Sequence, residues 1–382
     1  MVSFRQFEGP NNNIQIDING KRFAGFTSAS VQRSMDSLFG TFQFSTTVKE
    51  DADAIIDSNL KMEDEVTIFI DNQLVMTGYI DDFTNRSDVG SHYMAFSGKD
   101  ITADIAISSM PMFDQLNFKN FKTMVEKVLL KAEIDVKVIT DLSAKDLDTL
   151  NFDAFNNEGK APDLDMTIFD FFDHFAKQKQ VLLLTNEKGE LVITREESKI
   201  SPGVLTCKKK NNSNNILASN VSINTQERFS KVFISAQDVN AISKEQLNQE
   251  SFSVDSQIRK SKQRRVFYPN KTTDPNALKN MSQWYVNIYK SAGSVYSVAT
   301  QGYYAQAVSE ILWQINTLVD VEDEATRVKG QYLIEGFSFS KDVEQGSVTQ
   351  LRIVDKGSYT IKSEKEVKIT GGGKQMLEEL FN

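Results

Sequence analysis

Apolar and polar residues alternate along much of the first hundred positions. The alternation is clearest at Ile14, Ile16, Ile18, Phe42, Phe44, Val66, Ile68 and Ile70. A period of two is typical of strands that rest one face on a core. The polar residues 71–73 separate two such runs and predict a tight hairpin. Several short strands with turns between them favour a small barrel or sandwich, and we assign residues 1–107 to a first β-barrel domain.

The pattern changes to a helical period after Pro111. One predicted helix carries the apolar face Phe121, Met124, Val125, Val128, Leu129 and Ala132, and a second carries Ile168, Phe169, Phe172 and Phe175. A third is predicted to begin at Asp274-Pro275, which is a capping residue followed by proline. Residues 181–184 and 191–193 flank a turn and predict a hairpin. These elements indicate a discontinuous α/β domain over 108–205 and 240–300.

A short strand–turn–strand pattern occurs twice. Residues 74–80 and 332–338 align with Gly78 opposite Gly336, and each run is followed by a polar turn and a Gly-Ser pair. An internal repeat indicates two similar modules, so we assign 206–239 and 301–360 to a second β-barrel domain. The predicted fold class is α+β and mainly β, with two similar small β-barrel modules plus an α/β unit in a multi-domain chain.

Residues 361–382 form a separate tail. A flexible triglycine linker, Gly371–Gly373, precedes a segment with the pattern of a short helix. Its apolar positions are candidate partner-docking residues: Met376, Leu377, Leu380 and Phe381. Nine residues are too few for a stable isolated helix. The segment is therefore either frayed or folded against a partner, and the sequence leaves both alternatives open.

Composition narrows the function classes. The chain has 382 residues and a net charge of −9, which argues against a broad nucleic-acid-binding face. No apolar run approaches the roughly 18 residues of a membrane helix, so no membrane insertion is expected. The start of the chain lacks the layout of a signal peptide. The single cysteine, Cys207, excludes an intramolecular disulfide and favours folding in a reducing cytoplasm.

Candidate catalytic residues are few. His92 and His174 are the only histidines; His174 lies four residues after Asp170 and could join it in holding a metal, but a solvated polar helix face is the favoured interpretation. The basic run Arg259–Arg265 indicates a solvated strand or loop, or an electrostatic patch for a protein neighbour. Gly371–Lys374 lacks the spacing of a phosphate loop. We therefore predict no enzyme, no cofactor and no metal site.

Specific motifs then indicate a family. Val31–Met35, residues 75–81 and Phe96–Asp100 resemble the N-terminal block of baseplate hub proteins from contractile-tailed bacteriophages, of the phage Mu hub type and like the T-even phage hub. Residues 312–321 and 333–340 resemble the closing block of that family. Lys99 and Tyr303 depart from its pattern. The motif positions carried over as structural are Gly78, Gly98, Asp104, Trp313, Asn316 and Gly336.

The resemblance implies a structural protein of the virion. In such hubs, duplicated β barrels of a homotrimer form a pseudo-sixfold ring that adapts a sixfold tail tube to a threefold spike and encloses the DNA channel. The implied partners are other copies of the chain, the tail tube protein, the trimeric spike protein and other baseplate proteins, with genome DNA passing without specific binding. The implied location is the phage tail baseplate, assembled in the host bacterial cytoplasm.

Two other functions stay open on the sequence. A tail-associated cell-wall hydrolase would need paired carboxylates, for which 108–205 is the roomiest segment. A host-binding tail module would need an exposed recognition surface.

Overall fold

The protein was analysed as a computed structural model. The structure describes residues 12–57, 59–89, 91–113, 118–150, 166–197, 199–209, 214–237, 248–268, 275–306 and 310–360. Strand residues outnumber helical ones, 48% to 19%, which confirms an α+β fold that is mainly β. The described helices include none that is long and apolar enough to cross a membrane.

The described residues of the N-terminal region, up to Asp100, form seven strands and one helix. They are β1 (Ile14–Ile18), β2 (Lys21–Phe23), β3 (Ser28–Ser34), β4 (Thr41–Thr46), α1 (Lys49–Ile56), β5 (Glu65–Ile70), β6 (Gln73–Asp88) and β7 (Ser91–Asp100). The alternating residues predicted to face a core are buried on β1 and β5. The strands pair antiparallel in the order β1-β5-β6-β7-β4-β3, and β2 adds to β1. We call β1 and β3–β7 the first half-sheet.

The C-terminal region repeats this arrangement. Its strands are β11 (Ile200–Cys207), β12 (Ile216–Ile223), β16 (Ser294–Gln301), β19 (Thr317–Asp323), β20 (Val328–Asp342) and β21 (Gly346–Asp355). They pair in the order β11-β19-β20-β21-β16-β12. Position by position this is the order of the first half-sheet, except that β11 runs parallel to β19 whereas β1 runs antiparallel to β5. We call these six strands the second half-sheet.

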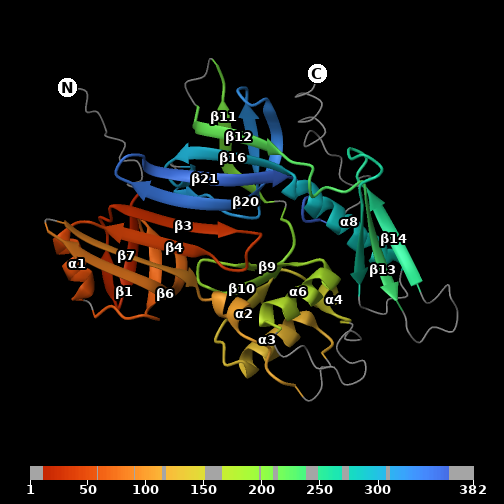
Figure 1. The fold of residues 1–382 in the computed structure, drawn as a ribbon, viewed down its shortest axis with the longest axis horizontal. Helices are drawn as coiled ribbons and strands as arrows, with labels where there is room; N and C mark the ends of the chain where they lie inside the picture. The colour runs from red at the N-terminus through yellow and green to blue at the C-terminus, as the bar shows by residue number, and fades with distance from the viewer. Residues whose placement is uncertain are drawn as a thin grey trace.

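The two half-sheets are one continuous sheet. The second part of β20 pairs with β3, so that 13 strands are joined (Figure 1). The predicted closed barrels are not found: in the described residues the strand pairings run through the junction instead of returning to close each half. Local alternation predicts the strands, but closure depends on which distant strands share an edge.

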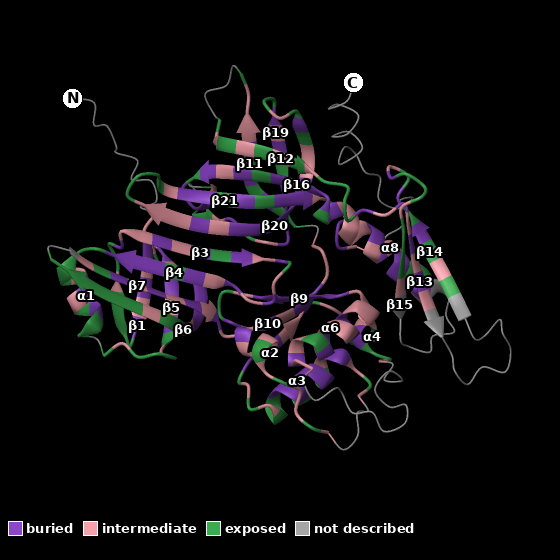
Figure 2. Ribbon diagram, viewed as in Figure 1, coloured by how far each residue is buried: buried purple, intermediate pink, exposed green. Residues whose placement is uncertain are grey.

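One hydrophobic core serves both half-sheets. Buried residues from β1, β5, β19 and β20 belong to the same cluster. Figure 2 shows buried positions alternating with exposed ones along the stacked strands. At about 25 cal/mol per Å2 of buried apolar surface, such a shared core is the main term that holds the halves together.

An α/β unit packs beside the sheet. Its elements are α2 (Ala103–Ile107), α3 (Phe121–Lys131), β8 (Val138–Thr140), α4 (Ala144–Leu147), α6 (Ile168–Lys179), β9 (Leu182–Thr185) and β10 (Leu191–Thr194). The predicted apolar face of α3 is confirmed, with Phe121 and Val128 fully buried. On α6 the buried set includes Phe171, which the predicted stripe lacked, while Phe169 is partly buried. The predicted hairpin is β9–β10.

A second small sheet packs on a long helix. It comprises β13 (Lys231–Gln237), β14 (Asn248–Val254) and β15 (Gln263–Tyr268), covered by α8 (Pro275–Ala292). A buried ion pair, Arg228 to Asp255 at 2.7 Å, lies at its end. β17 (Tyr304–Gln306) and β18 (Ile311–Leu312) form a further short pair.

The domain boundaries predicted from the sequence stay a prediction. The strand pairings place β16, of which all but Gln301 lies within the predicted α/β segment 240–300, in the large sheet.

Candidate functional site: the junction of the two half-sheets

The junction is a ladder between β3 and β20. It runs antiparallel from Gly336 opposite Ser34 to Asp342 opposite Ser28. β20 therefore changes partner along its length, with β19 beside its first part and β3 beside its second. This is the place where surfaces from the two ends of the chain meet.

Arg33 is a buried cation at the centre of the junction. Its guanidinium donates to the carbonyl oxygens of Val75, at 3.2 Å, and Asn186, at 3.1 Å. Burial lowers the pKa of Arg33, against the attraction of Asp100 and Glu187. The side chain thus ties the β9–β10 turn and β6 to β3, because moving either element would leave buried polar groups unpaired.

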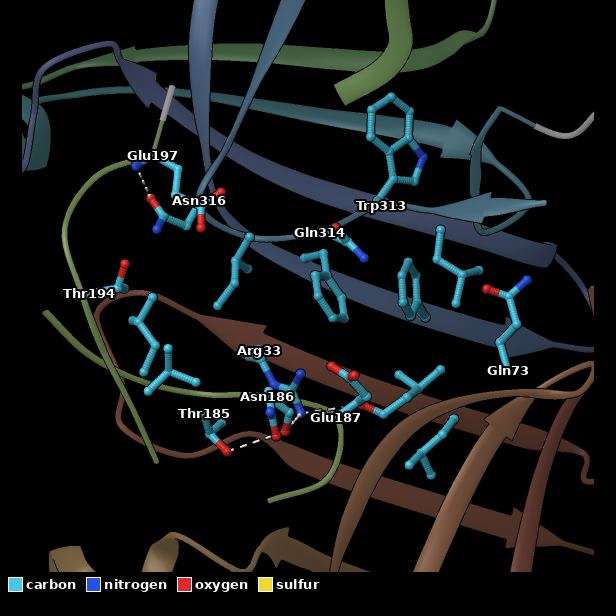
Figure 3. Close-up of a pocket in the computed structure, with 18 residues that line it drawn as sticks. Arg33, Gln73, Thr185, Asn186, Glu187, Thr194, Glu197, Trp313, Gln314 and Asn316 are labelled. Carbon is cyan, nitrogen blue, oxygen red and sulfur yellow. Dashed lines mark hydrogen bonds between the residues drawn. The ribbon is translucent and has the colours of Figure 1, made fainter. Parts of the chain in front are cut away.

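A cavity of about 360 Å3 lies beside Arg33. Figure 3 shows Arg33 next to Asn186 on one side and Trp313 on the opposite side. Its walls come from the first half-sheet, the β9–β10 hairpin and the segment before β19. The contacts of Arg33 are to backbone oxygens, so the guanidinium acts as a structural tie here.

Asp100 is a second buried charge near the junction. Its carboxylate accepts from the backbone N–H groups of Gly40, at 2.7 Å, and Thr102, at 3.1 Å, and from the Thr102 hydroxyl at 2.5 Å. Burial raises the pKa of Asp100, whereas Arg33 and these donors oppose the rise. The carboxylate fixes the loop before β4 and the start of α2.

A polar cluster lies at the bulge of β20, which is at Glu335 between Ile334 and Gly336. The Tyr359 hydroxyl is 2.7 Å from Asp36 Oδ1 and 2.5 Å from Glu335 Oε1, and Arg352 pairs with Glu335. Burial and then the charges of Glu335 and Asp36 raise the pKa of Tyr359. Burial likewise raises the pKa of Glu335. The cluster fastens the β3–β4 turn to β20 and β21.

The predicted glycines have two different structural roles. A Cβ on Gly78 would overlap the carbonyl of Lys99, and one on Gly98 would overlap the carbonyl of Tyr79. Both glycines therefore permit close approach of β6 and β7. At Gly336 an added Cβ would lie 3.2 Å from the Arg33 carbonyl oxygen, so this glycine belongs to the junction.

The positions of two β-bulges give a different alignment of the repeat from the one that the sequence suggested. β6 bulges at Asp81, between Ile80 and Asp82, and β20 bulges at Glu335, between Ile334 and Gly336. When the bulges are superposed, Gly78 corresponds to Tyr332 and not to Gly336. The sequence alignment of the two glycines was wrong because they fill different steric needs on strands of the same topology.

The other motif residues are also structural. Asn316 has φ 56°, donates to the Arg195 carbonyl at 3.0 Å and accepts from Glu197 N–H at 3.0 Å. Trp313 is buried, and its ring would meet a Cβ placed on Gly203. Asp104 lies in the first turn of α2, where burial and then Glu63 and Asp81 raise its pKa. Trp313 and Asn316 both line the cavity beside Arg33, whereas Asp104 does not.

The predicted docking positions of the tail fall outside the described residues: Met376, Leu377, Leu380 and Phe381. Sequence reasoning missed Glu335 and Tyr359 as a pair, since only the fold brings residues 24 positions apart together across the bulge.

Candidate reactive residues are held by structural contacts. Asp170 accepts from the Thr167 hydroxyl at 2.8 Å, while Thr167 caps α6. His92 Nε2 lies 2.7 Å from Asn85 Oδ1. In the part of the chain that the structure describes, no group of three or more His, Cys, Asp or Glu side chains could hold a metal ion.

The basic run Arg259–Arg265 ends on β15 of the small sheet. There Arg265 stacks over the Phe233 ring, 4.4 Å from its centroid, on the outer face of that sheet.

The site is thus a duplicated sheet whose two halves are fastened at the centre by buried polar contacts. Residues 13–100, the span from β1 to β7, match the family described as Mu phage baseplate assembly protein GpP-like, N-terminal. Baseplate hub protein gp44 of Escherichia phage Mu is 30% identical over 190 residues, which cover 49% of this chain and 47% of that protein. The aligned region thus spans about half the length of that relative.

Solved structures share the fold over most of the chain. The 43 kDa tail protein of prophage MuSo2 from Shewanella oneidensis has a TM-score of 0.74 at 22% identity, covering 91% of this chain and 99% of that one. The tail protein from Neisseria meningitidis MC58 has a TM-score of 0.76 at 18% identity, covering 91% and 98%. Together with the sequence matches, these findings confirm the predicted resemblance to a Mu-type baseplate hub.

Proposed function

We propose that this chain is the structural central hub of a phage-type tail baseplate and catalyses no reaction. The observation that carries the proposal is the identical pairing order of the two half-sheets, combined with the sequence match to a Mu baseplate hub protein. The homologues are structural tail and baseplate proteins, which favours a non-enzymatic role and a place in the virion tail.

The finer proposal is a homotrimer. Two half-sheets in each of three copies make six similar units, so a ring of them presents a pseudo-sixfold face to a sixfold tail tube. The same ring keeps true threefold symmetry for a trimeric spike on its other face. In the proposed ring, the half-sheets take the place of the barrels that the sequence predicted. The strand edges that are open in each half-sheet would pair with strands of a neighbouring half-sheet.

The proposed ring encloses a channel for the genome. A net charge of −9 supports passage of DNA without specific binding, because like charges repel. The α/β unit and the small sheet on α8 are proposed to lie outside the ring, where other baseplate proteins reach them. Assembly is proposed to take place in the host cytoplasm.

The test is the mass and symmetry of the full chain. Light scattering of the purified protein alone is expected to give about three times the chain mass of 43.1 kDa. With its tube and spike partners, the mass is expected to rise by that of the bound proteins while three copies of this chain remain. Class averages viewed down the axis are expected to show six similar densities. A strict monomer that never joins a trimeric spike contradicts the hub, and lysis of peptidoglycan by the chain alone would establish the hydrolase instead.

A further inference from the structure

Several strand edges of the large sheet are open among the described residues, including β2 and β11, and two others correspond to the junction strands. Residues 82–88 of β6 pair with β7 on one side, and among the described residues no strand pairs with their other side. β12 likewise pairs only with β16. Figure 1 shows β12 and β6 at opposite ends of the stack of strands, with the junction between them.

The β12 edge carries little of the usual protection: apart from a bulge near its start, between Ile216 and Ala218, it is a regular strand. Its eight residues, Ile216–Ile223, contain no charged side chain and no proline, and Leu217 is 59% exposed. Open edges in natural sheets are commonly blunted by lysine, proline or a bulge that turns the edge away, because an unprotected edge recruits another strand. An uncharged edge of this length is therefore typical of a strand that pairs in the assembled state.

The chain itself contains the template for that pairing. In the first half-sheet Val31, Phe42, Gly98 and Ile80 lie opposite one another across four strands, and Ile80 precedes the bulge. In the second half-sheet the corresponding row is Val221, Tyr296, Ile353 and Ile334, and Ile334 precedes the bulge. β12 is thus the counterpart of β3.

The open end of β6 is the counterpart of the second part of β20. Asp88 ends β6 seven residues after its bulge at position 81, and Asp342 ends β20 seven residues after its bulge at position 335. Within one copy, that part of β20 pairs with β3. Both members of the equivalent pair, β12 and the end of β6, are open in the single chain.

We infer that β12 pairs antiparallel with residues 82–88 of β6 from a second copy of this chain, repeating the β3–β20 junction between copies. The inference rests on the proposed homotrimer and adds the contact that builds it. Transferring the β3–β20 register places Phe83 opposite Ile223, Asn85 opposite Val221 and Arg86 opposite Asn220.

This register is chemically compatible. Phe83 and Ile223 are each partly buried against the margin of the large core, so the pairing joins two apolar side chains at the new seam. It sets no like charges opposite one another, since every β12 position is uncharged. Because the two edges are different surfaces, the contact is head-to-tail, and such a contact generates a ring when its rotation closes.

Engineered disulfides in the full chain test the pairing. Directly opposed antiparallel residues have Cα atoms about 4.5–5.5 Å apart, within disulfide reach. In a Cys207→Ser background, the double variant Arg86→Cys, Asn220→Cys is expected to form covalent dimers and trimers on mild oxidation. Arg86 and Asn220 are both exposed. The matched control is Arg86→Cys with Ser222→Cys, which is displaced by two residues and lies out of reach at about 7–8 Å.

The outcomes separate this inference from the proposed trimer. Covalent products that end at the trimer, in the first variant only, support both. Covalent products that extend into an open ladder support the edge pairing and contradict the trimer. A trimer by light scattering with no covalent product, or with equal products from the control, overturns the edge pairing and leaves the trimer standing. A monomer with no covalent product contradicts both.

A charge substitution gives a second readout. Asn220→Lys places a lysine opposite Arg86 of the neighbouring copy, and like charges directly opposed weaken pairing. The concentration needed for half-assembly is expected to rise about fivefold. Combining it with Arg86→Glu is expected to restore assembly. Unchanged assembly in Asn220→Lys, with the same thermal unfolding as the unsubstituted chain, overturns the pairing.

Discussion

At the scale of single residues, buried charges fasten distant strands. Asp323 is 2% exposed and accepts hydrogen bonds at 2.7 Å from the hydroxyls of Tyr296, Ser219 and Thr326. Burial acts to raise the pKa of Asp323, but these donors outweigh it and hold the pKa below its usual range. One carboxylate therefore links the end of β19 to β16 and to β12.

Asp323→Asn is expected to lower the free energy of unfolding by roughly 2–4 kcal/mol at pH 7, because three buried hydroxyls lose a charged acceptor. The folded-state pKa is depressed, so this stabilisation is present above the unfolded value of about 3.9 and is lost as the pH falls through the folded value. Urea denaturation of both proteins at pH 7 and below pH 4 measures the difference. A gap that stays constant with pH contradicts the assignment.

The sequence predicted correctly which residues are buried where alternation along a single strand determines their burial. Ile14, Ile16 and Ile68 are buried as their alternation indicates. It could not predict the partners of Asp323 or Arg33, since those depend on strands from distant segments meeting. It also matched Gly78 to Gly336 by identity, although the bulges show that these glycines occupy different positions.

At the scale of elements, β6 and β7 approach each other unusually closely near the bulge. Gly98 is bounded by the Tyr79 carbonyl and the Phe42 ring, and Gly78 by the Lys99 carbonyl. This closeness lets the long hairpin bend, so that its first part joins β5 while its end projects as an open edge.

Gly98→Ala is expected to lower the free energy of unfolding by about 1–3 kcal/mol or more, since the methyl group overlaps backbone that cannot move freely. Gly336→Ala is the matched control, because its Cβ would keep 3.2 Å from the nearest atom. Chemical denaturation of both variants gives the comparison. Equal losses in the two variants would show that close approach at Gly98 is not the cause.

Element types were largely predictable, whereas their connections were not. Periodicity located α3 and the β9–β10 hairpin, and α8 begins at the predicted proline. The union of the half-sheets through β3 and β20 joins residues about three hundred positions apart. No local pattern encodes such a pairing, and for that reason the sequence indicated two closed barrels.

At the scale of the whole molecule, the tail remains a proposed docking segment for the spike or a neighbouring subunit, through Met376, Leu377, Leu380 and Phe381. A chain that ends after Ser363 is expected to bind the trimeric spike at least tenfold more weakly, about 1.4 kcal/mol, because the apolar face is removed. Titration calorimetry measures the affinity. The control is Glu378→Gln with Glu379→Gln, which keeps that face, and full spike affinity in the shortened chain contradicts the docking.

The change of partner along β20 has a consequence for how the protein comes apart. Since one strand is shared by both half-sheets and one core lies beneath them, neither half can melt while the other keeps its edge intact. We therefore expect the N-terminal and C-terminal halves to unfold in one cooperative transition, and each half on its own to expose the part of the core that the other half covers. In the proposed ring, a load on one half-sheet would therefore be shared by the other half-sheet of the same copy.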